Sequence, residues 1–120
     1  MIKLTFALVR RPELTREQFQ DYWRNTHAPL VASVRDVLRI RRYVQLHSLP
    51  AEASAGLQAA RGGPEGFDGV AQLWWDSFED MAGADGEAAR AAGALLLEDE
   101  KRFVDLSRSP LWWGTEHVIF

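Results

Sequence analysis

Residues 15–30, Thr-Arg-Glu-Gln-Phe-Gln-Asp-Tyr-Trp-Arg-Asn-Thr-His-Ala-Pro-Leu, predict a helix with one apolar face. Thr15 and Gln18 have the spacing of a capping box, in which the two side chains satisfy free amides at a helix start. The helix is therefore expected to begin at Thr15. Side chains that recur every three or four residues then share one stripe of the helix: Phe19, Trp23, His27 and Leu30, with Tyr22 beside them.

Pro29 interrupts this helix, because proline has no amide hydrogen and its ring crowds the carbonyl group four residues earlier. We expect the helix to kink, or to restart with Pro29 in its first turn. The break lies next to His27 on the apolar stripe.

The sequence on either side of this helix predicts strands and a second helical layer. Apolar residues alternate or cluster in a β-type pattern in residues 2–9, 37–47, 67–76 and 111–120. Residues 48–66 are rich in Ala, Gly, Ser and Pro and predict a long connection, with a short helix near residues 53–61. Ser77 is placed to cap a short helix, and residues 88–106 predict a longer one with Glu100, Lys101 and Arg102 exposed.

The predicted order is strand, helix, strand, strand, helix, strand, which is the ferredoxin-like βαββαβ pattern of the α+β class. Such a protomer has a four-stranded antiparallel sheet with its two main helices on one face. At 120 residues, the chain is expected to form a single domain over residues 1–120. The uncovered face of the sheet would be too apolar to stay in water, so we expect a second copy of the chain to cover it in a homodimer.

Composition excludes several classes of function. The formal net charge is −3 and there is no long basic tract, which argues against nucleic-acid binding. The chain has no cysteine, so disulfides, thiolate metal sites and cysteine nucleophiles are excluded. The sequence contains no apolar run long enough to predict a membrane span or a secretion signal. We therefore expect a cytoplasmic protein without a membrane partner.

Four motifs, in this order along the chain, resemble the EthD family of dimeric α+β barrel proteins. They are Phe19-x-x-Tyr22-Trp23-x-x-x-His27-x-Pro29-Leu30, Asp68-Gly69-Val70-Ala71-x-Leu73-Trp74-Trp75-Asp76-Ser77, Glu98-Asp99-Glu100-x-x-Phe103-x-Asp105 and Glu116-His117-x-Ile119. The resemblance implies a dimer whose sheets pack face to face as a barrel. It also implies a group of proteins that includes lactone isomerases and cofactor-free polyketide-tailoring dehydratases and oxygenases. The family most often has an acidic residue where this chain has Gln72.

His27 is the candidate catalytic residue. An imidazole with a pKa near 6.5 can take or give a proton at neutral pH, and the stripe of the first helix aims it toward the sheet. The competing interpretation is a structural histidine that packs against Trp23 and donates a hydrogen bond to a carbonyl freed by the break.

Aromatic and histidine side chains elsewhere are candidates for substrate binding: Tyr22, Trp23, Tyr43, His47, Trp74, Trp75 and His117. Each of the pairs Trp74-Trp75 and Trp112-Trp113 should send one indole to each face of the sheet. The second indole of each pair would either stabilise the dimer or line an aromatic cavity.

No cofactor or metal is expected. The three histidines are widely separated, and neither a glycine-rich phosphate loop nor a dinucleotide fingerprint is present. The leading hypothesis is a cofactor-independent isomerase, dehydratase or oxidoreductase that acts by His-assisted proton transfer on a small hydrophobic carbonyl, lactone or aromatic metabolite. The alternative is a non-catalytic protein that binds such a molecule for another enzyme.

Overall fold

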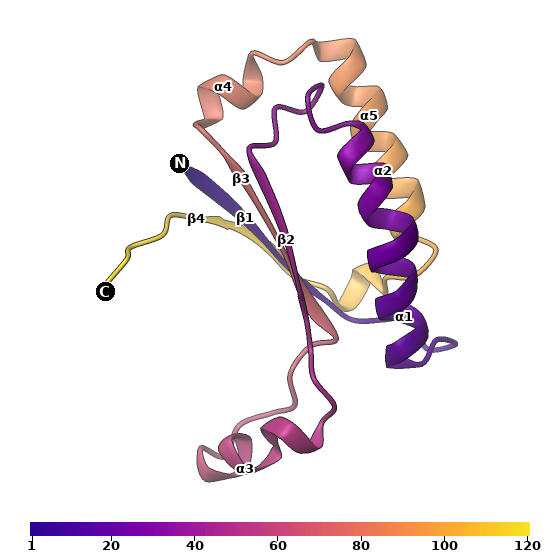
Figure 1. Cartoon of the computed structure of the whole chain (residues 1–120), viewed down its shortest axis with the longest axis vertical. Coiled ribbons are helices and arrows are strands. Elements are labelled where there is room, and N and C mark those ends of the chain that lie inside the picture. The colour runs from indigo at the N-terminus through magenta and orange to yellow at the C-terminus, as the bar shows by residue number, and fades with distance from the viewer.

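A computed structural model describes all residues 1–120 and shows a mixed α+β protomer with one four-stranded antiparallel sheet (Figure 1). The strand order is β2-β3-β1-β4, the ferredoxin-like arrangement predicted from the sequence. The strands are β1 (Ile2–Leu8), β2 (Arg42–His47), β3 (Gly69–Trp75) and β4 (Leu111–Gly114). The α-helices are α1 (Arg16–Tyr22), α2 (Ala28–Ser33), α3 (Glu52–Ala60), α4 (Phe78–Ala82) and α5 (Gly86–Glu100).

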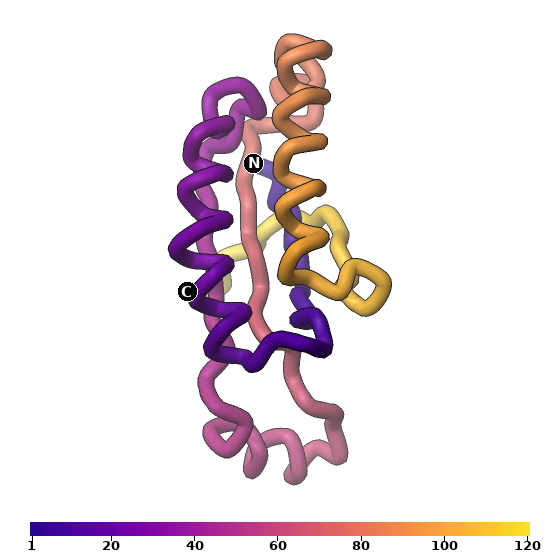
Figure 2. Tube along the Cα trace, turned by 90° about the vertical axis from the view of Figure 1, so that its right-hand side faces the viewer, coloured from indigo at the N-terminus to yellow at the C-terminus, as the bar shows by residue number.

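One face of the sheet is covered by two helical columns that lie side by side, α1 with α2 and α5 (Figure 2). The first column begins as predicted: the Thr15 hydroxyl accepts a hydrogen bond from the amide of Gln18, and the Gln18 side chain accepts one from the amide of Thr15. This capping box satisfies two amides that no earlier turn can reach.

The break before Pro29 is a single π-helical turn, Trp23–His27, between α1 and α2. The amide of Ala28 donates to the carbonyl of Trp23, five residues earlier, and Pro29 lies at the start of α2. Pro29 has no amide hydrogen to donate, and the wider turn accommodates this missing hydrogen bond without ending the helical column. The prediction that a helix restarts with Pro29 in its first turn is confirmed, and the restart follows a π-helical turn.

Three element boundaries differ from the sequence-based expectation. β2 begins at Arg42 rather than near residue 37, because residues 35–39 form turns and Arg39 has a left-handed φ of 58°. The helix expected over residues 88–106 ends at Glu100, and Val104 instead forms a bridge with Arg10. The last strand covers only Leu111–Gly114, and the tail beyond it runs away from the sheet (Figure 1).

The core lies between the helices and the sheet. Its centre is a cluster of fully buried side chains contributed by β1, the first helical column and the segment after α5: Leu8, Phe19, Trp23, Phe103 and Val104. Packing against this cluster orders residues 103 and 104 although no helix includes them. Hydrophobic burial of this kind is the main term that offsets the entropy of folding.

Tandem tryptophans place one indole on each face of the sheet, as expected. Trp75 is buried on the helix-covered face and makes an edge contact with Trp113, ring centroids 5.5 Å apart. Trp74 lies on the open face with the side chains of Lys3 and Arg42 over its ring. Trp112 is on that same open face and is 51% exposed.

The open face carries exposed apolar surface in this single chain, with Leu46 56% exposed on β2. The connection between β2 and β3 contains α3, which lies apart from both layers at one end of the molecule (Figure 1). Among the helices, none has the length and apolar character needed to cross a membrane.

Candidate functional site

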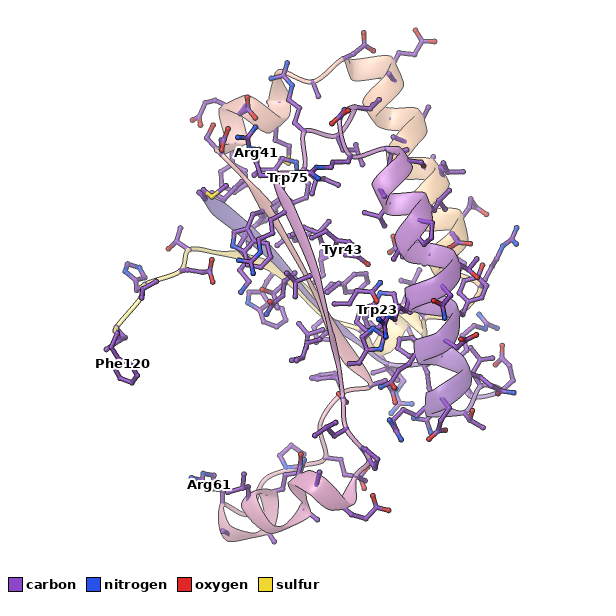
Figure 3. All side chains as sticks on the ribbon, viewed as in Figure 1. Trp23, Arg41, Tyr43, Arg61, Trp75 and Phe120 are labelled. Atoms are coloured by element: carbon purple, nitrogen blue, oxygen red, sulfur yellow. The ribbon has the colours of Figure 1, made fainter.

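A cavity of about 230 Å³ lies between the helices and the covered face of the sheet. Its walls are mainly apolar and include the rings of Trp23, Tyr43 and Trp75, which lie between the two layers in Figure 3. His27 and Glu100 supply its only acidic or basic side chains apart from the Tyr43 phenol. A small apolar space with a few polar groups is the usual form of a small-molecule site.

The imidazole of His27 is hydrogen-bonded to a carboxylate on the other helical column. Its Nδ1 is 2.7 Å from Oδ2 of Asp99 in α5, and its side chain is 7% exposed. The second oxygen of Asp99 accepts a hydrogen bond of 2.6 Å from the hydroxyl of Tyr22. Because a carboxylate only accepts, the neutral imidazole carries its proton on Nδ1 and donates it to Asp99.

The other ring nitrogen of His27, Nε2, has no hydrogen-bond partner in the protein. No buried side-chain nitrogen or oxygen is left without a partner, so Nε2 must remain in contact with accessible space. Since His27 lines the cavity, a molecule bound there can meet an unprotonated imidazole nitrogen. This is the geometry that a general base requires.

Burial and the carboxylate act in opposite directions on the imidazole. Burial lowers the pKa of His27 below its ordinary value of 6.5, and this effect outweighs the hydrogen bond and charge of Asp99, which raise it. Burial also acts to raise the pKa of Asp99, but the hydrogen bonds from Tyr22 and His27 prevail and lower it. The pair is therefore a neutral imidazole beside an ionised carboxylate at neutral pH.

The π-helical turn places His27 in this position. Trp23 begins the turn and His27 ends it, and both side chains are buried. The Trp23 carbonyl accepts hydrogen bonds from the amide of Ala28 and from the side chain of Gln45 on β2. The turn is thus hydrogen-bonded to the sheet as well as to α2.

Four of the residues predicted for the site meet at the cavity: His27, Trp23, Tyr43 and Trp75. Tyr22 does not line the cavity, but it is connected to His27 through their shared hydrogen-bond partner, Asp99. The competing interpretation of His27, a hydrogen bond to a freed carbonyl, differs from this structure, in which its partner is a carboxylate. The ring of His27 packs against Phe103, centroids 5.0 Å apart.

The remaining predicted residues lie away from this cavity. His47 stacks on Trp23, ring centroids 4.5 Å apart, and contacts Gln45, but it does not line the cavity. Trp74 is on the open face of the sheet, where its indole nitrogen donates to Glu116. His117 is exposed in the C-terminal tail. The structure does not bring these three side chains to the His27 cavity.

Asp99 was given no role from the sequence, and Glu100 was expected at the surface. Glu100 is instead half-buried and lines the cavity. A signal for this was present, because Gly93, Leu96 and Glu100 are spaced by three and four residues, which puts them on one stripe of α5. Asp99 lies one residue off that stripe, toward the first helical column.

No three His, Asp or Glu side chains converge in a way that could hold a metal ion. His27 and Glu100 alone offer ligand atoms in the cavity, and a stable metal site usually needs three or four. The absence of a cofactor stays a prediction from the sequence, to be tested by elemental analysis and a visible spectrum of the purified protein.

The fold and the cavity define a ferredoxin-like α+β protein with a mainly apolar cavity between its layers. Residues 11–107 match the family model described as the EthD domain. The chain belongs to the EthD family. No curated protein matches it significantly.

Solved structures share this fold at low sequence identity. An EthD-like protein from Ralstonia eutropha JMP134 is 21% identical, with a TM-score of 0.63 over 99% of this chain and 95% of that one. An ethyl tert-butyl ether D family protein from Bacillus halodurans C-125 is 22% identical, with a TM-score of 0.58 over 98% of this chain and 100% of that one. A dimeric protein of unknown function with a ferredoxin-like fold, from Bacteroides fragilis NCTC 9343, is 13% identical, with a TM-score of 0.57 over 96% of this chain and 95% of that one.

Proposed function

We propose that this protein is a cofactor-independent enzyme that moves a proton on a small hydrophobic carbonyl, lactone or aromatic metabolite bound in the His27 cavity. The observation that carries the proposal is the chain of hydrogen bonds from Tyr22 through Asp99 to His27, which leaves Nε2 as a free base in an apolar space. A positioned imidazole of this kind contributes about 10²–10⁴-fold to a rate.

The size of the cavity limits the substrate. An engineered apolar protein cavity of about 150 Å³ binds benzene. The cavity here, at about 230 Å³, therefore suits a single substituted ring.

A homodimer is part of the proposal. The open face of the sheet presents exposed Leu46 and Trp112 beside partly buried Val44 and Val70. A second copy packed on this face would remove that apolar area from water at about 25 cal/mol per Å². The barrel arrangement implied by EthD membership uses the same face.

The competing function is binding without chemistry, favoured by the predominantly apolar walls of the cavity. A suitable probe is 3-cyclohexen-1-one, a six-membered-ring ketone whose double bond moves into conjugation when one proton is relocated. Ultraviolet absorbance follows this isomerisation, and quenching of tryptophan fluorescence follows binding. If the protein binds the probe without isomerising it, the binding function is the correct one.

The decisive variant is His27→Gln, because an amide keeps hydrogen-bonding capacity but cannot titrate. We expect turnover of the probe to fall by about 10²-fold or more, with affinity and melting temperature retained. Unchanged turnover with a clearly lower melting temperature would show that His27 is structural.

A further inference from the structure

Glu100 reaches the same cavity as His27 from the opposite helical column. It shares an inward stripe of α5 with Gly93 and Leu96, both of which also line the cavity. Asp99, the preceding residue, points instead toward Tyr22 and His27. Two adjacent carboxyl groups on one helix therefore have different surroundings, one hydrogen-bonded and one facing apolar space.

The carboxyl group of Glu100 has no hydrogen-bond or ion-pair partner. Its neighbour Lys101 pairs with Glu98 on the outside of the helix. Because no buried polar atom lacks a partner, the carboxyl oxygens of Glu100 must be in contact with accessible space, and Glu100 is one of the residues that line the cavity. Like Nε2 of His27, they are free to meet a bound molecule.

The charged and titratable groups around Glu100 do not favour its ionised form. His27 faces the cavity from the π-helical turn, Tyr43 from β2, and Asp99 is next to Glu100 on α5. No Lys or Arg side chain lines the cavity. Burial, and then the charge of Asp99, raise the pKa of Glu100 to about 7. Much of the protein at neutral pH therefore holds a protonated, neutral Glu100 beside a neutral His27.

We propose that Glu100 is the proton donor that works with the His27 base, and that the cavity is specific for uncharged ring carbonyl compounds that rearrange without net oxidation. This inference rests on the proposed function and deepens it. An acid paired with the His27 base favours proton relocation over the dehydration and oxidation reactions that the proposed function also allows.

The proposed step balances without any co-reactant. Nε2 of His27 removes a proton from the carbon next to the carbonyl, and the C–H electron pair forms a carbon–carbon double bond. The carbonyl π electrons move to oxygen, which takes the proton of Glu100 and becomes an enol hydroxyl. In a ring ketone with a β,γ double bond, such as 3-cyclohexen-1-one, this enol is a dienol. Its hydroxyl then returns the proton to Glu100 and the O–H electron pair re-forms the carbonyl. The enol double bond moves between the α and β carbons, and the electron pair of the original β,γ double bond takes the imidazolium proton at the γ carbon, which restores the neutral His27.

The specificity for uncharged molecules has an electrostatic reason. An anionic substrate would lose its hydration in the cavity without gaining a cation partner, and burial of an unpaired charge is costly. The nearby negative charge of Asp99 adds repulsion. A neutral carbonyl group, by contrast, gains a hydrogen bond from protonated Glu100.

The test compares wild type with Glu100→Gln, and uses Glu98→Gln as the matched control. Glu98 lies two residues away on the same helix, exposed and paired with Lys101, so it matches the change in charge but is outside the cavity. Three quantities are measured: isomerisation of 3-cyclohexen-1-one, relative affinity for cyclohexanone and cyclohexanecarboxylate, and the ¹³C NMR titration of the Glu100 carboxyl. The Glu100 signal is assigned by its loss in Glu100→Gln.

We expect Glu100→Gln to lower isomerisation by about 10²-fold without weakening the binding of cyclohexanone, and Glu98→Gln to behave as wild type. Wild type should bind cyclohexanone more tightly than cyclohexanecarboxylate, and Glu100 should titrate near neutrality. If Glu100→Gln keeps wild-type turnover while His27→Gln loses it, the role of Glu100 is overturned and the proposed function stands. A Glu100 titration in the ordinary carboxylate range also overturns that role. If wild type neither isomerises the ketone nor binds cyclohexanone, both proposals fail.

Discussion

Nδ1 of His27 and Oδ2 of Asp99 lie 2.7 Å apart and join the two helical columns above the sheet. The contact links the end of the π-helical turn to the last turn of α5. It fixes the tautomer of the imidazole and leaves Nε2 unprotonated on a residue that lines the cavity. In the proposed reaction Asp99 is a positioning residue, since it does not line the cavity and acts there only through His27.

Asp99→Asn should lower isomerisation of 3-cyclohexen-1-one by about 10²–10⁴-fold, as expected when an orienting carboxylate is lost. Asp99 also raises the pKa of His27 against the effect of burial. Its loss should therefore move the acidic limb of the kcat/KM profile to lower pH. Asp21→Asn is the control, because Asp21 is an exposed carboxylate on α1. A lower rate without movement of that limb would contradict the positioning role.

The free energy of unfolding should depend on pH through Glu100. Its pKa is raised from 4.5 to about 7 in the folded protein, so the unfolded chain loses this proton first as the pH rises. Stability therefore falls between pH 4.5 and about 7 and levels off above. His27 has the opposite effect, because its lowered pKa makes stability fall as the pH drops below 6.5.

Glu100→Gln removes the first of these two dependences. We expect its melting temperature, relative to wild type, to be higher at about pH 8 than at about pH 4. Calorimetry at a series of pH values measures the difference. An offset that does not change with pH would mean that the Glu100 carboxyl is not desolvated in the folded protein.

Gly69→Ala should destabilise the fold through Trp23. A Cβ atom at Gly69 would overlap the Trp23 ring and approach the Leu46 carbonyl oxygen to 2.8 Å. We expect a loss of about 1–3 kcal/mol, the usual cost of overpacking a core, measured by urea unfolding. Gly114→Ala is a matched control in β4, where an added Cβ meets no atom within 4 Å. Equal effects at the two glycines would refute close packing of the helix on β3.

The oligomeric state tests the use of the open face. Light scattering should give twice the 13.6 kDa mass of the chain. Leu46→Lys, on the open face of β2, should weaken self-association by at least about tenfold. Leu97→Lys makes the same exchange at an exposed position of α5 and should leave the dimer intact. A wild-type monomer, or equal weakening by both variants, would exclude this face as the interface.

Local sequence determined much of the fold. The capping box at Thr15, the interruption before Pro29 and the alternation in residues 67–76 depend on neighbours a few residues apart, so each could be predicted from the chain alone. The same spacing rule placed His27 on the buried stripe and sent the tandem indoles to opposite faces. Local patterns thus account for the architecture and for four predicted residues that line the cavity: His27, Trp23, Tyr43 and Trp75.

Tertiary structure alone decided the rest. Asp99 meets His27 across 72 positions of sequence, and no local pattern fixes the rotation of one helical column against the other. The start of β2 depends on the left-handed turn at Arg39, whose side chain binds Asp80, far along the chain. Glutamate usually lies at the protein surface, but the packing of α5 turns the stripe that contains Gly93, Leu96 and Glu100 toward the cavity. The surroundings that separate the pKa values of Asp99 and Glu100 arise only when the helices and sheet enclose the cavity, because desolvation and hydrogen bonding are properties of the folded chain.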